Sequence, residues 1–176
     1  MPRLQKRFSR MFGVDTTATL YLCTNSNSLS GGLELQLSTF LQMHPDTKLV
    51  IIDTLQKVRE LSGNNYSYSQ DYAIISKLKT IAAEHNICII VVHHTRKLEA
   101  EDKFDMISGT NGLLGAADGA MVLHKNKRTD LHASLSIVGR EQQDQTLALE
   151  FLPQTCTWKF VQAQKDLWQE PADPLL

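Results

Sequence analysis

The chain lacks several features that would assign it to a specialised class of protein. Its three cysteines, Cys23, Cys88 and Cys156, form no CxxC pair, so neither a disulfide framework nor a thiolate zinc site is indicated. No apolar run approaches the about 20 residues that a membrane-spanning helix needs. The basic N-terminus has neither the apolar stretch nor the cleavage site of a signal peptide. These absences predict a cytoplasmic protein with no membrane partner.

An excess of charge is also missing, because the formal net charge is −1. Bulk charge therefore gives no sign of a nucleic-acid binder, although it does not exclude a local basic patch. What is present is a globular balance of 42% hydrophobic and 21% charged residues in a chain of 176. Such a chain can form one domain with a buried core. We expect the core to span residues 1–162, followed by a tail, 163–176, without a clear pattern.

Hydrophobic periodicity predicts alternating helices and strands. Apolar residues at helical spacing predict an amphipathic helix over Arg3–Phe12, ended by Gly13, a second helix over Leu33–Leu41, and a third that buries Ile74 to Ala82. Strands are predicted at Thr19–Cys23, Leu49–Ile52, Ile87–Val92, Ala120–Leu123, Leu131–Val138, Thr146–Phe151 and Thr157–Val161. The last three are expected to form an antiparallel meander.

The strand over Leu49–Ile52 is unbroken and apolar, which is typical of a parallel strand buried on both faces. It ends on Asp53 and Thr54, and an apolar strand followed by an aspartate is the Walker B pattern. The alternative is a core strand whose terminal aspartate starts a turn. Because one helix links this strand to Ile87–Val92, the two strands should pair in parallel. Asp53 and His94 are then expected at the same edge of the sheet.

Four stretches together resemble the RecA-like P-loop ATPases, in particular the RepA-type hexameric helicases and AAA-family ATPases related to DnaB-type helicases. They are LVIIDT at 49–54, VVHHTRK at 91–97, SGTNGLLGAADGAMVL at 108–123 and IVGRE at 137–141. The resemblance implies an α/β fold in which a RecA-like, mostly parallel sheet is flanked by helices and followed by a C-terminal antiparallel meander. It also implies a role in DNA replication, ATP and Mg²⁺ as cofactors, and a homo-oligomeric ring, a hexamer in the family.

The resemblance also implies roles for single residues. Asp53 would hold Mg²⁺, with Thr54 beside it in the nucleotide site, and His94 would sense the γ-phosphate. The alternative for His94 is a loop histidine bonded to backbone carbonyls. Arg140 would be a finger that reaches a neighbouring subunit's nucleotide. The alternative for Arg140 is a surface ion pair with Glu141 or a nearby acid.

Two predicted loops, Arg59–Tyr68 and Thr95–Leu114, match the regions that touch single-stranded DNA in RecA-like rings. The residues that would contact DNA are aromatic and basic. They are Tyr66 and Tyr68, which would stack on bases, and Arg96, Lys97 and Lys103, which would follow phosphates. Acidic residues outnumber basic ones in the second loop, which counts against this interpretation.

One element of the family is missing from the sequence. A P-loop needs glycines and a Lys-Ser/Thr pair that cradle phosphates, and none of the nine glycines is followed by lysine. We therefore expect the first P-loop βα unit and the strand with the catalytic glutamate to be absent, so the chain alone should not hydrolyse ATP. Three hypotheses remain: the C-terminal portion of a RepA-like ATPase, a degenerate non-catalytic regulator that binds DNA or a partner, or an unrelated α/β enzyme that uses Asp53 and His94 as an acid–base pair.

Overall fold

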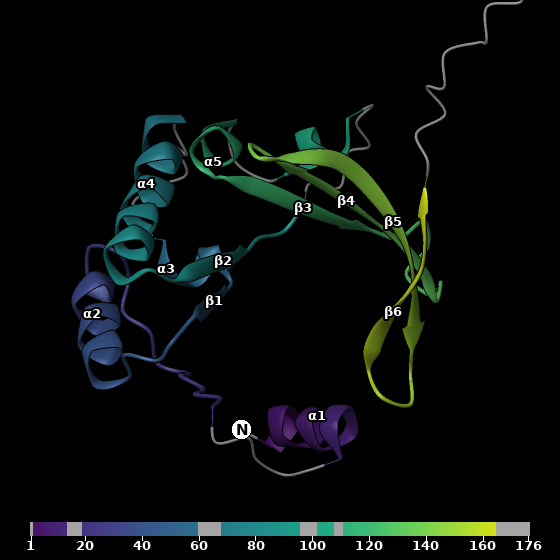
Figure 1. The fold of residues 1–176 in the computed structure, drawn as a ribbon, viewed down its shortest axis with the longest axis horizontal. Coiled ribbons are helices and arrows are strands. Elements are labelled where there is room, and N and C mark those ends of the chain that lie inside the picture. Colours follow the sequence, from purple (N-terminus) through teal and green to yellow (C-terminus); the bar gives the residue numbers. More distant parts are fainter. Residues whose placement is uncertain (1, 14–18, 60–67, 96–101, 108–110, 165–176) are drawn as a thin grey trace, which may run out of the picture. The chain divides into compact units, whose positions relative to one another are not determined.

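A computed structural model describes residues 2–13, 19–59, 68–95, 102–107 and 111–164. The chain divides into two compact units, Leu22–Asp118 and a second unit made of Met1–Tyr21 with Gly119–Leu176 (Figure 1). We call the first the parallel unit and the second the antiparallel unit, after the sheet that each contains.

The N-terminal helix α1, Pro2–Phe12, confirms the predicted amphipathic helix. It ends at Gly13, whose φ of 67° lies in the left-handed region and whose N–H donates to the Ser9 carbonyl at 2.9 Å. Phe8 and Phe12 stack along one side of α1, with ring centroids 5.9 Å apart. The spacing of apolar residues was therefore a sufficient guide to this helix.

The strand predicted at Thr19–Cys23 is wrong, because these residues have no strand pairing in the structure. Side-chain bonds hold the following segment instead. Gln36 of the next helix donates to the Asn25 carbonyl at 3.0 Å and accepts from the Asn27 N–H at 2.9 Å. Side-chain bonds of this kind offer the backbone an alternative to a sheet.

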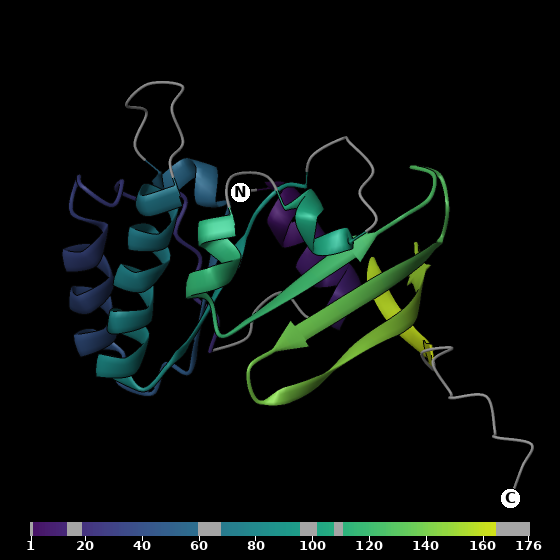
Figure 2. The same ribbon diagram turned by 90° about the horizontal axis from the view of Figure 1, so that it is seen from above.

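The parallel unit combines helices with a two-stranded sheet. Its elements are α2 (Leu33–Met43), β1 (Leu49–Asp53), α3 (Leu55–Val58), α4 (Tyr68–His85), β2 (Cys88–Val92), the 3₁₀ helix η1 (Lys103–Met106) and α5 (Asn111–Ala116). Figure 2 shows α2 and α4 side by side. The core is formed by Leu33, Leu41, Ile52, Leu55, Val58, Leu78, Ile81 and Leu113. The predicted helices and the two apolar strands are thus confirmed. The expectation that β1 is buried on both faces is wrong, because Leu49 and Ile51 on one face are 48% and 58% exposed.

Strands β1 and β2 pair in parallel, with Leu49 opposite Cys88 and Asp53 opposite Val92. The chain leaves α4 through Asn86, which has a φ of 51°, and the Ile87 N–H donates to the Ala82 carbonyl at 3.0 Å. This left-handed residue ends the helix and turns the chain directly into β2. The expected strand–helix–strand crossover is therefore present.

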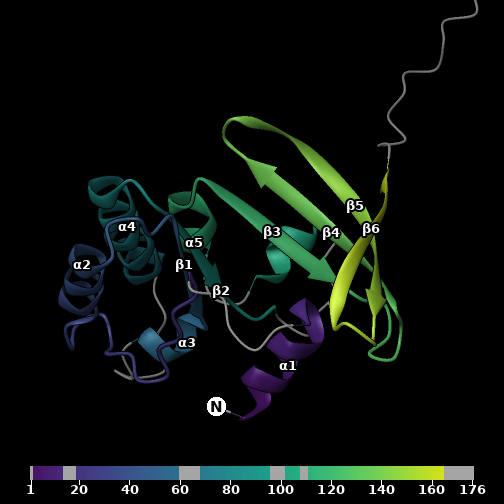
Figure 3. The same cartoon turned by 60° about the horizontal axis from the view of Figure 1, so that its bottom comes forward.

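The antiparallel unit contains a four-stranded sheet in the order β3-β4-β5-β6 (Figure 3). Its strands are β3 (Gly119–His124), β4 (His132–Gly139), β5 (Gln142–Leu152) and β6 (Thr157–Gln164). Consecutive strands pair as neighbours. The predicted α/β class with a C-terminal antiparallel meander is confirmed.

Candidate functional site

The carboxyl ends of β1 and β2 bring the main predicted site residues to one edge of the parallel sheet. Asp53 is the last residue of β1 and pairs with Val92, the last residue of β2, so His93 and His94 follow directly beside it. Asp53 and His94 are exposed, whereas Thr54 and His93 are half-buried. The predicted juxtaposition of Asp53 and His94 at one sheet edge is therefore what the strand register shows.

Helix α3 anchors the chain immediately after Asp53. The Asp53–Thr54 peptide bond is cis, and Thr54 occupies the N-cap position of α3. Leu55 and Val58 are only 1% and 2% exposed, so this short helix is held by the core rather than by its own length. The Val58 carbonyl also accepts from the Leu29 N–H at 2.9 Å. The backbone that presents Asp53 and Thr54 is thus fixed from its buried side.

A buried ion pair continues this anchor. Arg59, directly after α3, pairs with Asp71 in the first turn of α4, and their side chains are 6% and 1% exposed. Sequence analysis missed this pair. One signal could have found it: Asp71 lies three, seven and ten residues before Ile74, Leu78 and Ile81, on the apolar stripe of α4. An acid on that stripe needs a buried partner.

A β-bridge joins two points within the second predicted loop, Thr95–Leu114. Thr95, which follows His94, pairs with Ile107 in an isolated antiparallel bridge. Between them, the Asp102 side chain caps η1 by accepting from the Phe104 N–H at 2.8 Å. Lys103 is the first residue of η1 and is half-buried. This bridge keeps Ile107 next to the strand end that carries His94.

The remaining predicted DNA contacts are only partly visible. Tyr66, Arg96 and Lys97 lie outside the described residues. Tyr68 begins α4, is exposed, and stacks on Tyr72 with ring centroids 6.1 Å apart. Of the two tyrosines predicted to stack on bases, Tyr68 therefore presents an accessible ring.

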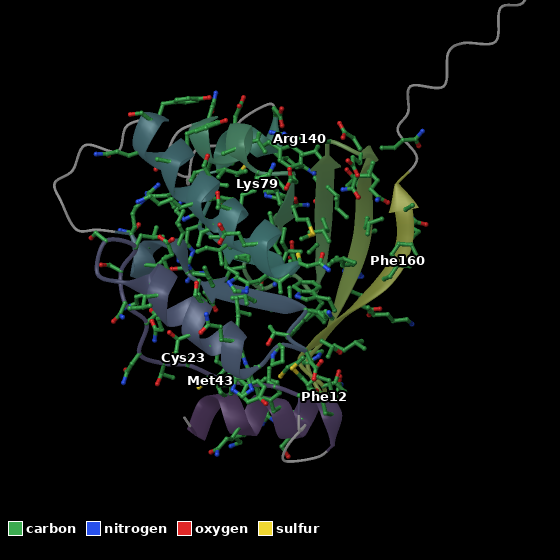
Figure 4. The ribbon with its side chains drawn as sticks, turned by 60° about the vertical axis from the view of Figure 1, so that its left-hand side comes forward. Phe12, Cys23, Met43, Lys79, Arg140 and Phe160 are labelled. Carbon is green, nitrogen blue, oxygen red and sulfur yellow. The ribbon has the colours of Figure 1, made fainter. Side chains whose placement is uncertain are left out.

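Arg140 lies in the antiparallel unit, in the turn between β4 and β5 (Figure 4). Its side chain is exposed, as is that of Glu141. The strands at this end approach closely because Gly119 pairs with Gly139. A Cβ on Gly119 would lie 2.9 Å from the Val138 carbonyl oxygen. Glycine at position 119 thus lets β3 lie close to the end of β4, next to the turn that carries Arg140.

The sequence model of a family described as "AAA domain" matches residues 2–100, which include α1, β1, α4 and β2. The chain belongs to this AAA domain family. The resemblance to RecA-like P-loop ATPases drawn from the strand-end motifs is thereby confirmed.

The fold of this AAA domain chain is also found in a solved structure described as "The Structure Of A DnaB-Like Replicative Helicase And Its Interactions With Primase". The TM-score is 0.59 at 20% sequence identity, over 75% of this chain. The match spans 35% of the helicase chain, so the present chain corresponds to about one third of that protein's length. No curated protein matches the sequence.

The AAA domain assignment implies Mg²⁺ and a nucleotide, and the strand-end residues can be tested against both. No group of three or more His, Cys, Asp or Glu side chains that could hold a metal occurs among the described residues. A full protein cage for a metal is thus not found there. Mg²⁺, however, is usually bound through one or two carboxylates together with phosphates and water. One exposed carboxylate beside a hydroxyl, as in Asp53 and Thr54, fits that requirement.

Membrane insertion finds no support in the helices of this AAA domain chain. Within the ranges that the structure describes, no helix combines the length and the apolar character needed to cross a membrane.

Proposed function

We propose that this chain contributes the Mg²⁺-holding and phosphate-sensing side of a nucleotide site in a RepA-type, RecA-like ATPase or helicase of DNA replication. The observation that carries the proposal is the β1–β2 register, which sets Asp53 opposite Val92 and so puts His94 at the same sheet edge. Ligands of open α/β sheets bind at the carboxyl ends of their strands. Membership of the AAA domain family supports a nucleotide as this ligand.

In this proposal each strand-end residue has one task. Asp53 would hold Mg²⁺ directly or through water, and the half-buried Thr54 hydroxyl would bind beside it. The exposed His94 would donate a hydrogen bond to a γ-phosphate oxygen. Mg²⁺, when bound, would neutralise charge on the phosphate oxygens. The buried side of α3 keeps the Asp53–Thr54 backbone in place while these groups bind.

Arg140 would act across a subunit boundary. A guanidinium is planar and carries several donors, so it can stabilise charge that develops on a transferring phosphoryl group. Its exposed position on a tight turn would let it reach a neighbouring copy. A homo-oligomeric ring is therefore part of this proposal.

Single-stranded DNA would be the substrate on which the oligomer acts. Tyr66 and Tyr68 would stack on bases, and Arg96, Lys97 and Lys103 would contact phosphates. The exposed ring of Tyr68 supports this assignment. The bridge between Thr95 and Ile107 would link the second DNA-contacting segment to the strand that ends near His94.

A second candidate function is a non-catalytic regulator of replication that binds DNA or a partner. It is favoured by one observation: none of the nine glycines in the 176 residues is followed by lysine. The first proposal therefore needs a phosphate-cradling loop from residues outside these 176. For either function, this chain alone should show ATP turnover at background level, since P-loop amides and lysine supply much of the charge stabilisation.

The test is Mg²⁺-dependent binding of a fluorescent ATP analogue to the 176-residue chain. We expect weak binding that Asp53→Ala abolishes and that Asp46→Ala, an exposed aspartate before β1, leaves unchanged. Asp53→Asn keeps the side-chain shape and should also fail, because an amide does not replace a Mg²⁺-binding carboxylate. Binding that needs no Mg²⁺, or that survives Asp53→Ala, would contradict the proposed site. ATP turnover above background that Asp53→Ala removes would contradict the statement that this chain needs a phosphate-cradling loop from other residues.

A further inference from the structure

A basic and aromatic surface lies at the end of the antiparallel sheet opposite Arg140. The β3–β4 and β5–β6 connections meet there, because the β4–β5 turn that carries Arg140 occupies the other end of the same meander. We call this the basic hairpin surface and define it by Lys125, Lys127, Arg128, Trp158 and Phe160. None of these residues belongs to the nucleotide site proposed above.

The surface joins the two edges of the sheet. Strands β3 and β6 are at opposite edges, yet the Lys125 ammonium, one residue after β3, lies 5.8 Å from the centroid of the Trp158 ring on β6. The Phe151 ring supports Trp158 from the neighbouring strand at 5.1 Å between centroids. A cation over a tryptophan face is an attractive arrangement. The β3–β4 connection therefore folds over the end of the sheet toward Trp158.

The connection itself is arranged so that its cations project outward. The Asp130 carboxylate accepts from the Lys127 backbone N–H at 2.9 Å, and the Lys125 ammonium donates to the Arg128 carbonyl at 3.2 Å. The one acid of the connection is thus used by the backbone of the turn. The Lys127 and Arg128 side chains are exposed and form no ion pair with any described residue.

Aromatic surface continues from this cationic turn along β6. Phe160 follows Trp158 by two residues and so lies on the same face of the strand, and its side chain is 55% exposed (Figure 4). Glu150 and Lys159 are paired on the opposite face, because they are one residue removed from Phe151 and Trp158. The aromatic face at this end of the sheet therefore carries cations and no acid from these strands.

We propose that the basic hairpin surface binds single-stranded nucleic acid. Surfaces that hold single strands combine cations that follow the phosphates with aromatic rings on which bases stack. Lys127 and Arg128 supply the cations. Phe160 and the edge of the Trp158 ring supply the aromatic surface. An acidic polypeptide would match the cations but has no flat bases for an exposed ring, which is why the aromatic residues favour nucleic acid. The proposal does not depend on the nucleotide site or on the loops assigned to DNA above.

Fluorescence anisotropy of a labelled oligo(dT) with the full chain tests the cationic part. Lys127→Glu combined with Arg128→Glu should weaken binding at least tenfold. It should also reduce the magnitude of the negative slope of log affinity against log salt concentration by about 1.4, which is about 0.7 for each lost phosphate contact. The matched control is Lys48→Glu with Lys77→Glu, which makes the same charge change at exposed positions of the parallel unit. Equal loss in both double variants would overturn the proposal, since it would show a bulk charge effect. The milder pair Lys127→Gln and Arg128→Gln, with an unchanged unfolding midpoint, guards against misfolding.

The aromatic part has its own readout, because the chain has two tryptophans, Trp158 and Trp168. Oligo(dT) should quench intrinsic fluorescence in Trp168→Phe and not in Trp158→Phe, and Phe160→Ala should weaken binding about tenfold. Quenching that persists in Trp158→Phe would overturn the assignment. So would competition by polyglutamate as effective as that by unlabelled oligo(dT), which would indicate an acidic protein partner.

A last experiment distinguishes binding at the basic hairpin surface from binding at the DNA-contacting loops proposed for the parallel unit. Arg96→Glu with Lys97→Glu should leave the Trp158 quenching intact even if it abolishes the DNA contacts proposed for the parallel unit. Loss of that quenching in the loop variant would place the nucleic-acid site at the loops and overturn the present proposal.

Discussion

The guanidinium of Arg59 and the carboxylate of Asp71 form an ion pair inside the parallel unit, where their side chains are 6% and 1% exposed. The pair joins the end of α3 to the first turn of α4 and thereby braces the backbone that leaves Asp53. A second ion pair joins Lys79 of α4, labelled in Figure 4, to Asp118, and their side chains are 43% and 68% exposed. The two pairs differ in their exposure to solvent, so they should contribute differently to the free energy of unfolding.

Removing one partner of the buried pair should be strongly destabilising. Arg59→Ala or Asp71→Ala leaves an uncompensated buried charge, which costs about 3–5 kcal/mol, whereas Arg59→Met with Asp71→Leu should be close to neutral. Lys79→Ala at the exposed pair should cost about 1 kcal/mol or less. Urea unfolding of the four variants measures these differences. Equal costs for Arg59→Ala and Lys79→Ala would show that burial of the Arg59 pair is not maintained in solution.

Replacement of His94 should change the discrimination between ATP and ADP. A hydrogen bond to a charged phosphate oxygen is worth about 1.5–3 kcal/mol, so His94→Ala should weaken ATP binding about tenfold or more and leave ADP unaffected. His94→Gln should retain part of the preference, since an amide can also donate. The control is His132→Ala, at an exposed histidine of the antiparallel unit. If His94→Ala weakens both nucleotides equally, the side chain does not sense the γ-phosphate.

Alanine at Gly119 should destabilise the pairing of β3 with β4 next to the turn that carries Arg140. Its Cβ would lie 2.9 Å from the Val138 carbonyl oxygen and 3.5 Å from the Gly139 Cα, and backbone atoms cannot move aside cheaply. A cost of about 1–3 kcal/mol is expected from such overpacking. Gly115→Ala is the contrast, because its Cβ meets only the Tyr68 hydroxyl, at 3.3 Å, and alanine favours the helix by up to about 1 kcal/mol. Thermal unfolding compares the two, and a larger loss for Gly115→Ala would refute the packing argument.

The small parallel sheet should drive self-association. Among the described strands, β1 and β2 pair only with each other, and Ile51 and Val92 on its outer face are 58% and 37% exposed. Apolar strands with an open edge readily pair with another chain. Sedimentation velocity should show concentration-dependent association that Ile51→Lys reduces and that Leu35→Lys, at an exposed position of α2, does not. A monomer at all concentrations, with slowly exchanging β2 amides, would contradict this expectation.

The sequence by itself determined the local elements and the class of fold. The unbroken apolar run Leu49–Ile52 before Asp53 indicated a strand and the stripe of Leu78 and Ile81 indicated a helix, so the crossover and the shared edge of Asp53 and His94 followed. The meander followed for the same reason. The apolar residues at Thr19–Cys23 carry a strand pattern as well, but none of the described strands pairs with them and Gln36 binds the adjoining backbone instead.

Only the tertiary structure decided which distant side chains meet. Arg59 and Asp71 are separated by a segment whose course no periodicity describes, and the energy of their contact depends on burial that arises when α3 and α4 pack together. Lys125 and Trp158 belong to opposite edges of a sheet, and they meet because the β3–β4 connection folds over its end. Strand patterns specify which face a residue occupies, whereas contacts across a sheet end depend on twist and turn geometry, which local sequence leaves open.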